Sequence, residues 1–150
     1  MNPHHGGAPT ISRTIPSRMA EAESLCLKVR ALLQRESLCQ ICFPVELLAR
    51  ECLSNAMIHG NQGDTRKSVQ FRLWIGRQWV RLQVSDEGSG FAWRKVLASR
   101  PNTAKPHGRG LQLYTLYAGR VRFNRRGNQI TLWIRKSPTG KEDGNGCLRH

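Results

Sequence analysis

The chain has 150 residues, which is enough for one domain with a single hydrophobic core but not for two. Hydrophobic residues make up 39% of the sequence, which excludes a disordered or fibrous chain, and no apolar run approaches the roughly 18 residues that span a bilayer. Lys and Arg outnumber Asp and Glu by 24 to 10, and the net charge of +14 favours an acidic partner, whether protein, nucleotide or nucleic acid. Because residues 1–7 lack the basic and apolar regions of a secretory leader, we expect a cytoplasmic protein.

The five cysteines are an odd number for a short chain, which argues against a disulfide framework. Cys39 and Cys42 form a C-x-x-C pair, a spacing found in redox sites and in half of a structural zinc site. The sequence contains no second pair to complete a zinc site, so we interpret both residues as half-buried thiols between helices.

The first part of the chain is predicted to be mainly helical. Residues 1–9, rich in Gly, Pro and His, are expected to form a disordered tail, and residues 10–15 a short strand. Apolar residues at steps of three and four predict an amphipathic helix from Ser17 to near Ser37. A second helix is expected to begin at Pro44 and to stop at Gly60 and Asn61.

From residue 68 onward the apolar period changes from 3.6 to two. The alternation predicts strands over residues 68–75 and 79–85, joined by a turn at Gly76. Residues 86–110 are expected to be a loop with a short helix near residues 93–98, followed by a third helix over residues 111–118. A last hairpin is expected over residues 121–123 and 130–134, around the turn-favouring pair Gly127-Asn128, and residues 137–150 form a flexible tail.

This order of elements predicts an α/β (α+β) two-layer sandwich over residues 10–136. Each strand has one apolar face, and helices on one side of a mixed sheet can cover these faces.

The first loop that carries candidate chemistry is Asp86-Glu87-Gly88-Ser89-Gly90-Phe91, directly after a strand. Its two glycines allow a tight turn and a close approach to a flat ligand. The carboxylate at the strand end can accept a hydrogen bond from an exocyclic amino group such as that of adenine. The same pattern also occurs in plain turns, which is the alternative interpretation.

The second loop, His107-Gly108-Arg109-Gly110, runs directly into the third helix. Exposed N–H groups at a helix start bind phosphate, and glycines let the phosphate come close, with Lys105 and Arg109 adding positive charge. A glycine-rich hinge before a helix is the alternative. Neither a P-loop nor a G-x-G-x-x-G dinucleotide pattern is present in the sequence.

A polar stripe on the second helix is the third candidate. Glu51, Asn55 and His59 recur at every fourth position and therefore lie along one side. A carboxylate one turn from an amide oxygen suits a general base beside a magnesium ligand, because magnesium prefers oxygen donors. A solvated polar face would have the same spacing.

Together the three segments resemble the GHKL ATPase superfamily, in which they are the N box and the two glycine boxes. The matching motifs are Glu51-x-x-x-Asn55-Ala56-x-x-His59-Gly60, Asp86-x-Gly88-x-Gly90-Phe91 and Gly108-Arg109-Gly110-Leu111. Within the superfamily, the short single-domain form is similar to the anti-sigma factor serine kinases of bacterial partner-switching systems. The resemblance covers about residues 10–136.

The resemblance implies a Bergerat-type fold that binds ATP and Mg²⁺. It implies that Glu51 activates the attacking hydroxyl or water, that Asn55 binds magnesium and that Asp86 accepts a hydrogen bond from the adenine amino group. The other implied nucleotide contacts are His59, Gly88, Gly90, Phe91, Lys105, Gly108, Arg109 and Gly110, and residues 92–107 match the mobile ATP lid. Two positions depart from the family pattern: Gln112 replaces a common glycine, and the usual threonine before the last strand has only Asn128 nearby.

The resemblance further implies a serine protein kinase that phosphorylates a STAS-domain anti-anti-sigma partner and also binds and restrains a sigma factor. The alternative is a partner-binding module that uses ATP only as a conformational ligand, and the intact Glu51 favours the kinase. A histidine kinase fragment fits less well, because the chain has no helix pair carrying a phospho-accepting histidine.

Strand alternation assigns a second group of side chains to the sheet face opposite the helices: Arg72, Trp74, Trp79, Arg81, Trp133 and Arg135. Three tryptophans are a large apolar area to leave in water, and protein interfaces favour tryptophan and arginine. We therefore expect this face to dock a protein, either a second copy in a homodimer or an acidic partner. Stacking of single-stranded nucleic acid on the tryptophans is the competing hypothesis.

Overall fold

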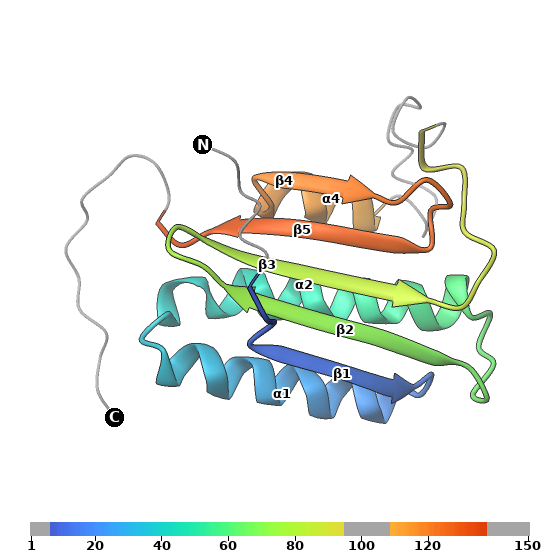
Figure 1. Ribbon diagram of the computed structural model, residues 1–150, viewed down its shortest axis with the longest axis horizontal. Helices are drawn as coiled ribbons and strands as arrows, with labels where there is room; N and C mark the ends of the chain where they lie inside the picture. The colour runs from blue at the N-terminus through green and yellow to red at the C-terminus, as the bar shows by residue number, and fades with distance from the viewer. Residues whose placement is uncertain (1–6, 95–108, 138–150) are drawn as a thin grey trace.

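The computed structural model describes residues 7–94 and 109–137, which form one sheet with helices on a single face (Figure 1). The strands are β1 (Ile11–Pro16), β2 (Ser68–Ile75), β3 (Trp79–Asp86), β4 (Arg120–Phe123) and β5 (Gln129–Arg135). The helices are α1 (Met19–Arg35), α2 (Cys42–Asn55) and α4 (Arg109–Tyr117), with a 3-10 turn at Cys39–Ile41 and a π-helical turn at Ala56–Gly60 that continues α2. The predicted two-layer α+β sandwich is confirmed.

The strands lie in the order β1-β2-β3-β5-β4, and every neighbouring pair is antiparallel. The mixed sheet expected from the sequence is therefore not found. Figure 1 shows the reason at the first connection: α1 runs back along the sheet and α2 returns, so the chain enters β2 at the end where β1 stopped. A parallel pair would need a crossover that brings the chain back to the starting end.

The core lies between the sheet and the helices, where the predicted apolar faces meet. Phe71 pairs with Val84 and Leu73 pairs with Leu82, and all four side chains are at most 2% exposed. They share one buried cluster with the apolar stripes of α1 and α2, including Leu25, Val29, Leu33, Val45, Ala49 and Leu53. Because each buried large aliphatic side chain contributes about 1.5–3 kcal/mol, this face fixes which side of each strand points inward.

Two bidentate ion pairs fasten α1 to α2 outside the apolar core. The Arg30 guanidinium donates to both carboxylate oxygens of Glu46 at 2.6 and 2.9 Å, and the Glu46 residue is only 5% exposed. Arg50 donates to both oxygens of Glu23 at 2.9 and 2.8 Å. A buried carboxylate needs such a partner, so Glu46 fixes the spacing of the two helices rather than interrupting their packing.

The element ends differ slightly from those expected. Helix α1 stops at Arg35 because Ser37 takes a left-handed backbone conformation (φ 58°). Helix α2 begins two residues before Pro44, which is tolerated because the N–H groups of the first turn have no partner within the helix.

The two cysteines of the C-x-x-C pair are both free thiols. Cys39 is exposed and Cys42 is half-buried. None of the helices in the described ranges is long and apolar enough to cross a membrane.

Candidate functional site

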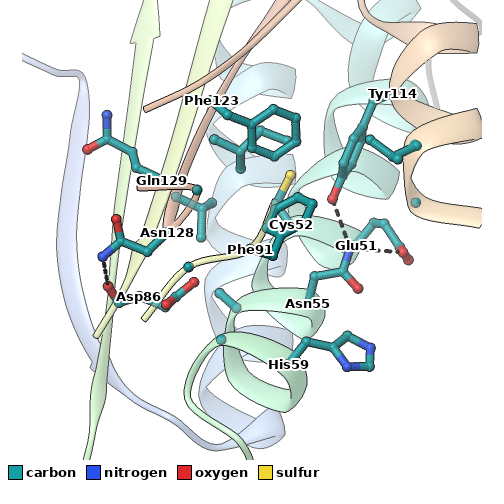
Figure 2. A pocket seen from close by; sticks show the side chains of 18 residues that line it. Glu51, Cys52, Asn55, His59, Asp86, Phe91, Tyr114, Phe123, Asn128 and Gln129 are labelled. Atoms are coloured by element: carbon teal, nitrogen blue, oxygen red, sulfur yellow. Dashed lines mark hydrogen bonds between the residues drawn. The ribbon is translucent and has the colours of Figure 1, made fainter. Parts of the chain in front are cut away.

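A cavity of about 320 Å³ lies between α2, the end of β3, the start of α4 and the β4–β5 hairpin (Figure 2). This volume is within the range of small-molecule sites. Seven of the predicted site residues line it: Glu51, Asn55, His59, Asp86, Gly90, Phe91 and Gly110. The carboxylates and amides lie around an apolar centre of Val84, Leu111, Phe123 and Ile130.

The other four predicted residues do not line the cavity or lie outside the described residues. Gly88 lies directly beneath the Asp86 carboxylate. The Arg109 backbone begins α4, and Lys105 and Gly108 lie outside the described residues, as does most of the predicted lid.

Asp86 forms one wall of the cavity at the end of β3. Its Oδ1 accepts the Gly88 N–H at 2.7 Å, and within the described ranges no hydrogen bond is recorded for Oδ2. Burial raises the pKa of the Asp86 carboxyl, while the Gly88 N–H and the charges of Lys67 and Arg126 act in the opposite direction. One carboxylate oxygen is therefore held by the backbone, and the other can accept from a ligand amino group.

The glycines around Asp86 are required by close contacts. A Cβ on Gly60 would lie 2.3 Å from the Asp86 carboxyl carbon, and a Cβ on Gly88 would lie 2.1 Å from the Gly60 carbonyl oxygen. Any side chain at either position would displace the carboxylate or the loop. The π-turn at Ala56–Gly60 thus ends directly against the glycine loop that follows β3.

Two asparagines hold that loop in place. The Asn128 amide donates to the carbonyls of Asp86 at 3.1 Å and Gly88 at 3.4 Å, and Figure 2 shows it beside Asp86. The fully buried Asn61 donates to the Ser68 carbonyl at 3.0 Å and accepts the Glu87 N–H at 2.9 Å. The sequence identified Asn61 only as a helix stop, because its two partners are distant in the chain.

Aromatic rings form the apolar side of the cavity. The Phe91 ring meets Phe123 edge to face at a centroid distance of 5.3 Å. Gly90, with φ +83°, lets the loop backbone approach the β4–β5 turn, where a Cβ would lie 1.8 Å from the Arg126 carbonyl oxygen. A flat heterocycle is the kind of ligand that such a wall accommodates.

Glu51, Asn55 and Tyr114 form a hydrogen-bonded group at the other end of the cavity. The Asn55 amide nitrogen donates to Glu51 Oε1 at 3.2 Å and to the Tyr114 hydroxyl at 2.9 Å (Figure 2). Both N–H groups of the Asn55 amide are engaged in these two hydrogen bonds. Its Oδ1 accepts no hydrogen bond from the described residues, so this oxygen is the atom that can bind a cation. An amide oxygen beside a carboxylate is a donor set that suits Mg²⁺.

Gly110 brings the start of α4 against this group. A Cβ on Gly110 would lie 2.9 Å from both Asn55 Nδ2 and Glu51 Oε1, so only glycine allows the helix start to come this close. Free N–H groups in the first turn of a helix bind phosphate oxygens. The residues present therefore fit a magnesium–triphosphate group at this end and an adenine at the Asp86 end.

Tyr114 was missed by the sequence analysis, which placed it in the third helix without a role. It is 4% exposed, and burial raises the pKa of its hydroxyl well above the usual value. Burial also raises the pKa of the neighbouring Cys52 thiol to about 12, so both groups are neutral at physiological pH. In the sequence, a role for Tyr114 is indicated only by its position four residues after Gly110, which places both residues on the same side of a helix. Any amphipathic helix has residues at this spacing.

The comparisons with known proteins agree with this geometry. Residues 15–136 match the family of histidine kinase-like ATPase domains. No curated protein matches the chain. Since the family match covers most of the chain and its members bind ATP with Mg²⁺, the chain belongs to the histidine kinase-like ATPase domains and is an ATP-binding, kinase-like module.

Proposed function

We propose that this chain is an ATP-dependent serine protein kinase that phosphorylates a STAS-domain anti-anti-sigma partner and also binds and restrains a sigma factor. The observation that carries the proposal is the Glu51–Asn55 pair, one helical turn apart, with the side chains in contact at 3.2 Å beside the start of α4. It supports a general base next to a magnesium ligand at the phosphate end of the cavity.

In this proposal the two ends of the cavity have different tasks. Asp86 accepts from the adenine amino group, and the rings of Phe91 and Phe123 contact the base. Asn55 holds magnesium through its amide oxygen, and magnesium when bound neutralises charge on the phosphate oxygens. Lys105 and Arg109 supply further positive charge to the phosphates.

Glu51 acts on the serine of the partner protein. Its carboxylate orients the hydroxyl and takes the proton as the serine oxygen bonds to the γ-phosphorus, while the bond to the β–γ bridging oxygen breaks and ADP leaves. Tyr114 and Glu51 together keep the Asn55 amide in one orientation, so Tyr114 is a positioning residue.

The test is incubation of the full chain with labelled Mg-ATP and a STAS-domain protein encoded nearby, followed by detection of phosphoserine. Glu51→Gln keeps the size of the side chain but removes the base, so phosphotransfer should fall by roughly two to four decades while ATP binding survives. Glu36→Gln, on the exposed residue after α1, is the matched control and should retain the wild-type rate.

Two results would overturn parts of the proposal. Wild-type phosphotransfer in Glu51→Gln would remove Glu51 from the mechanism. Partner binding that responds to ATP without any phosphoserine in the wild type would establish the alternative, a nucleotide-responsive binding module without kinase activity.

A further inference from the structure

The sheet face opposite the helices, called here the open face, carries arginines and tryptophans on neighbouring strands. Directly paired residues share a face, and Arg81 pairs with both Trp74 and Trp133, while Trp79 pairs with Arg135. The predicted assignment of these side chains to the open face is confirmed. Strand β4 adds Arg120 and Arg122, paired with Trp133 and Thr131.

The open face is strongly one-sided in charge. Its strand positions hold five arginines (Arg72, Arg81, Arg120, Arg122 and Arg135), and its other positions are Trp, Ser, Thr, Gln or Pro. The acidic residues of the described ranges lie on the helices, in loops or on the other face at the end of β3, and none forms a salt bridge with these arginines. The positive charge of the open face is therefore not neutralised within the described part of the chain.

Guanidinium groups cover the tryptophan rings. Arg81 lies 3.9 Å from the Trp74 ring centroid, Arg120 lies 5.0 Å from that of Trp133, and Arg135 lies 5.5 Å from that of Trp79. Trp133 is only 5% exposed. The expected large apolar area in water is therefore not found, because the arginines shield it, and a nucleobase would have to displace a guanidinium in order to stack.

A hollow of about 340 Å³ lies in the middle of the open face. Its lining includes Arg72, Trp74, Arg81, Arg122 and Trp133. Trp133 Nε1 and Arg81 Nε are buried there, and neither has a hydrogen-bond acceptor within the described ranges. Because both atoms are buried, an acceptor from outside reaches the hollow only at the outer guanidinium nitrogens of its arginines.

We propose that the open face docks a protein partner through an acidic segment, whose carboxylates lie against the guanidinium groups of the open-face arginines. Arginine forks bind carboxylates in a bidentate manner, and the absence of acidic side chains from the open-face strand positions leaves them available. A second copy fits less well, because face-to-face packing would oppose arginines with arginines. Single-stranded nucleic acid fits less well, because the rings are already covered.

This docking surface is distinct from the nucleotide cavity. The two hollows share only Gln129 among their lining residues. A partner on the open face leaves the Asp86 and Asn55 ends of the nucleotide cavity uncovered, so the inference does not depend on the kinase activity.

The experiment measures binding of a fluorescent oligo-glutamate peptide to the full chain. The test variant combines Arg72→Gln, Arg81→Gln and Arg122→Gln on the open face. The matched control combines Arg18→Gln, Lys28→Gln and Arg35→Gln, which removes the same charge from exposed positions on or beside α1. A thermal unfolding midpoint is recorded for each protein to show that it is folded.

We expect the open-face variant to bind the peptide at least about tenfold more weakly, and the control variant to lose less than about threefold. Gln83→Glu, a single change that places a carboxylate in the hollow, should also weaken binding. It serves as the second test if the triple variant does not fold.

Three outcomes would overturn the proposal. Equal losses in the open-face and control variants would mean that only net charge matters. Tighter binding of an oligothymidine strand than of the peptide, lost in the open-face variant, would make the ligand a nucleic acid. A dimer mass in light scattering that falls to a monomer in Gln83→Glu would make the occupant a second copy.

Discussion

Replacing Tyr114 by phenylalanine tests how the Asn55 amide is held. The substitution removes one hydroxyl, which accepts from Asn55 Nδ2 at 2.9 Å, and keeps the ring in its buried position. A buried hydrogen bond of this kind contributes about 1 kcal/mol, so the unfolding midpoint should fall by about 4 °C. The Asn55 amide can take two orientations, and only one of them directs its oxygen to the cation. Losing about 1 kcal/mol lowers the population ratio that favours this orientation by a factor of about five.

Titration calorimetry of ATP in magnesium and in EDTA separates orientation from packing. In Tyr114→Phe, affinity in magnesium should fall about fivefold and affinity in EDTA should stay at the wild-type value. Tyr117→Phe is the matched control on the same helix, where the ring meets Phe43 edge to face at 6.0 Å. Equal loss with and without magnesium, or an unchanged midpoint together with unchanged affinity, would refute the role given to Tyr114.

Further predictions concern the adenine end of the cavity. Asp86→Asn should weaken ATP binding by about 1.5–3 kcal/mol, one charge-assisted hydrogen bond, and calorimetry that gives equal adenine and guanine nucleotide affinity would contradict the assignment. Because burial raises the Asp86 pKa above 3.8, the accepting carboxylate is lost as pH falls through the raised value. As the pH is lowered, the ratio of wild-type to Asp86→Asn affinity for ATP should therefore begin to decline while the pH is still above 3.8. A ratio that stays constant down to pH 3.8 would contradict the raised pKa of Asp86. In calorimetric unfolding, Gly90→Ala should destabilise the fold by about 1–3 kcal/mol more than Gly63→Ala. Both glycines have positive φ, but only at Gly90 would the added Cβ lie 1.8 Å from a backbone oxygen. Equal losses of stability would show that the loop at Gly90 relaxes.

The sheet and the helices were predictable because the signal that sets them is local. Val80, Leu82 and Val84 alternate with polar residues, and the amphipathic helices predicted from the same sequence can bury that face. The antiparallel order was not predictable from the same pattern. Whether β4 or β5 lies beside β3 depends on the path of the chain between them, and either strand offers an apolar face.

The contacts of the candidate site also include some that were predictable from the sequence and some that were not. Glu51 and Asn55 are one turn apart on a helix, so their contact follows from spacing alone. The contact of Asn55 with Tyr114 spans 59 positions and depends on how α4 packs on α2, which no periodicity reports. The arginines of β4 were missed for a related reason, since a strand of four residues is too short for its alternation to be distinguished from chance.

The π-turn at Ala56–Gly60 has a consequence for how the chain tolerates changes in length. A π-turn contains one residue more than a regular α-helical turn. Here the Asn61 N–H donates to the Ala56 carbonyl oxygen, five residues earlier, at 2.7 Å. The extra residue lets Asn55 face α4 while Gly60 still meets Asp86. Ile58 is 52% exposed, so its side chain has few contacts to lose. Deleting it, however, would restore regular winding and rotate Gly60 by about 100° about the helix axis, away from Asp86. At this position natural variation in residue type should therefore be wide, and insertions or deletions should be rare.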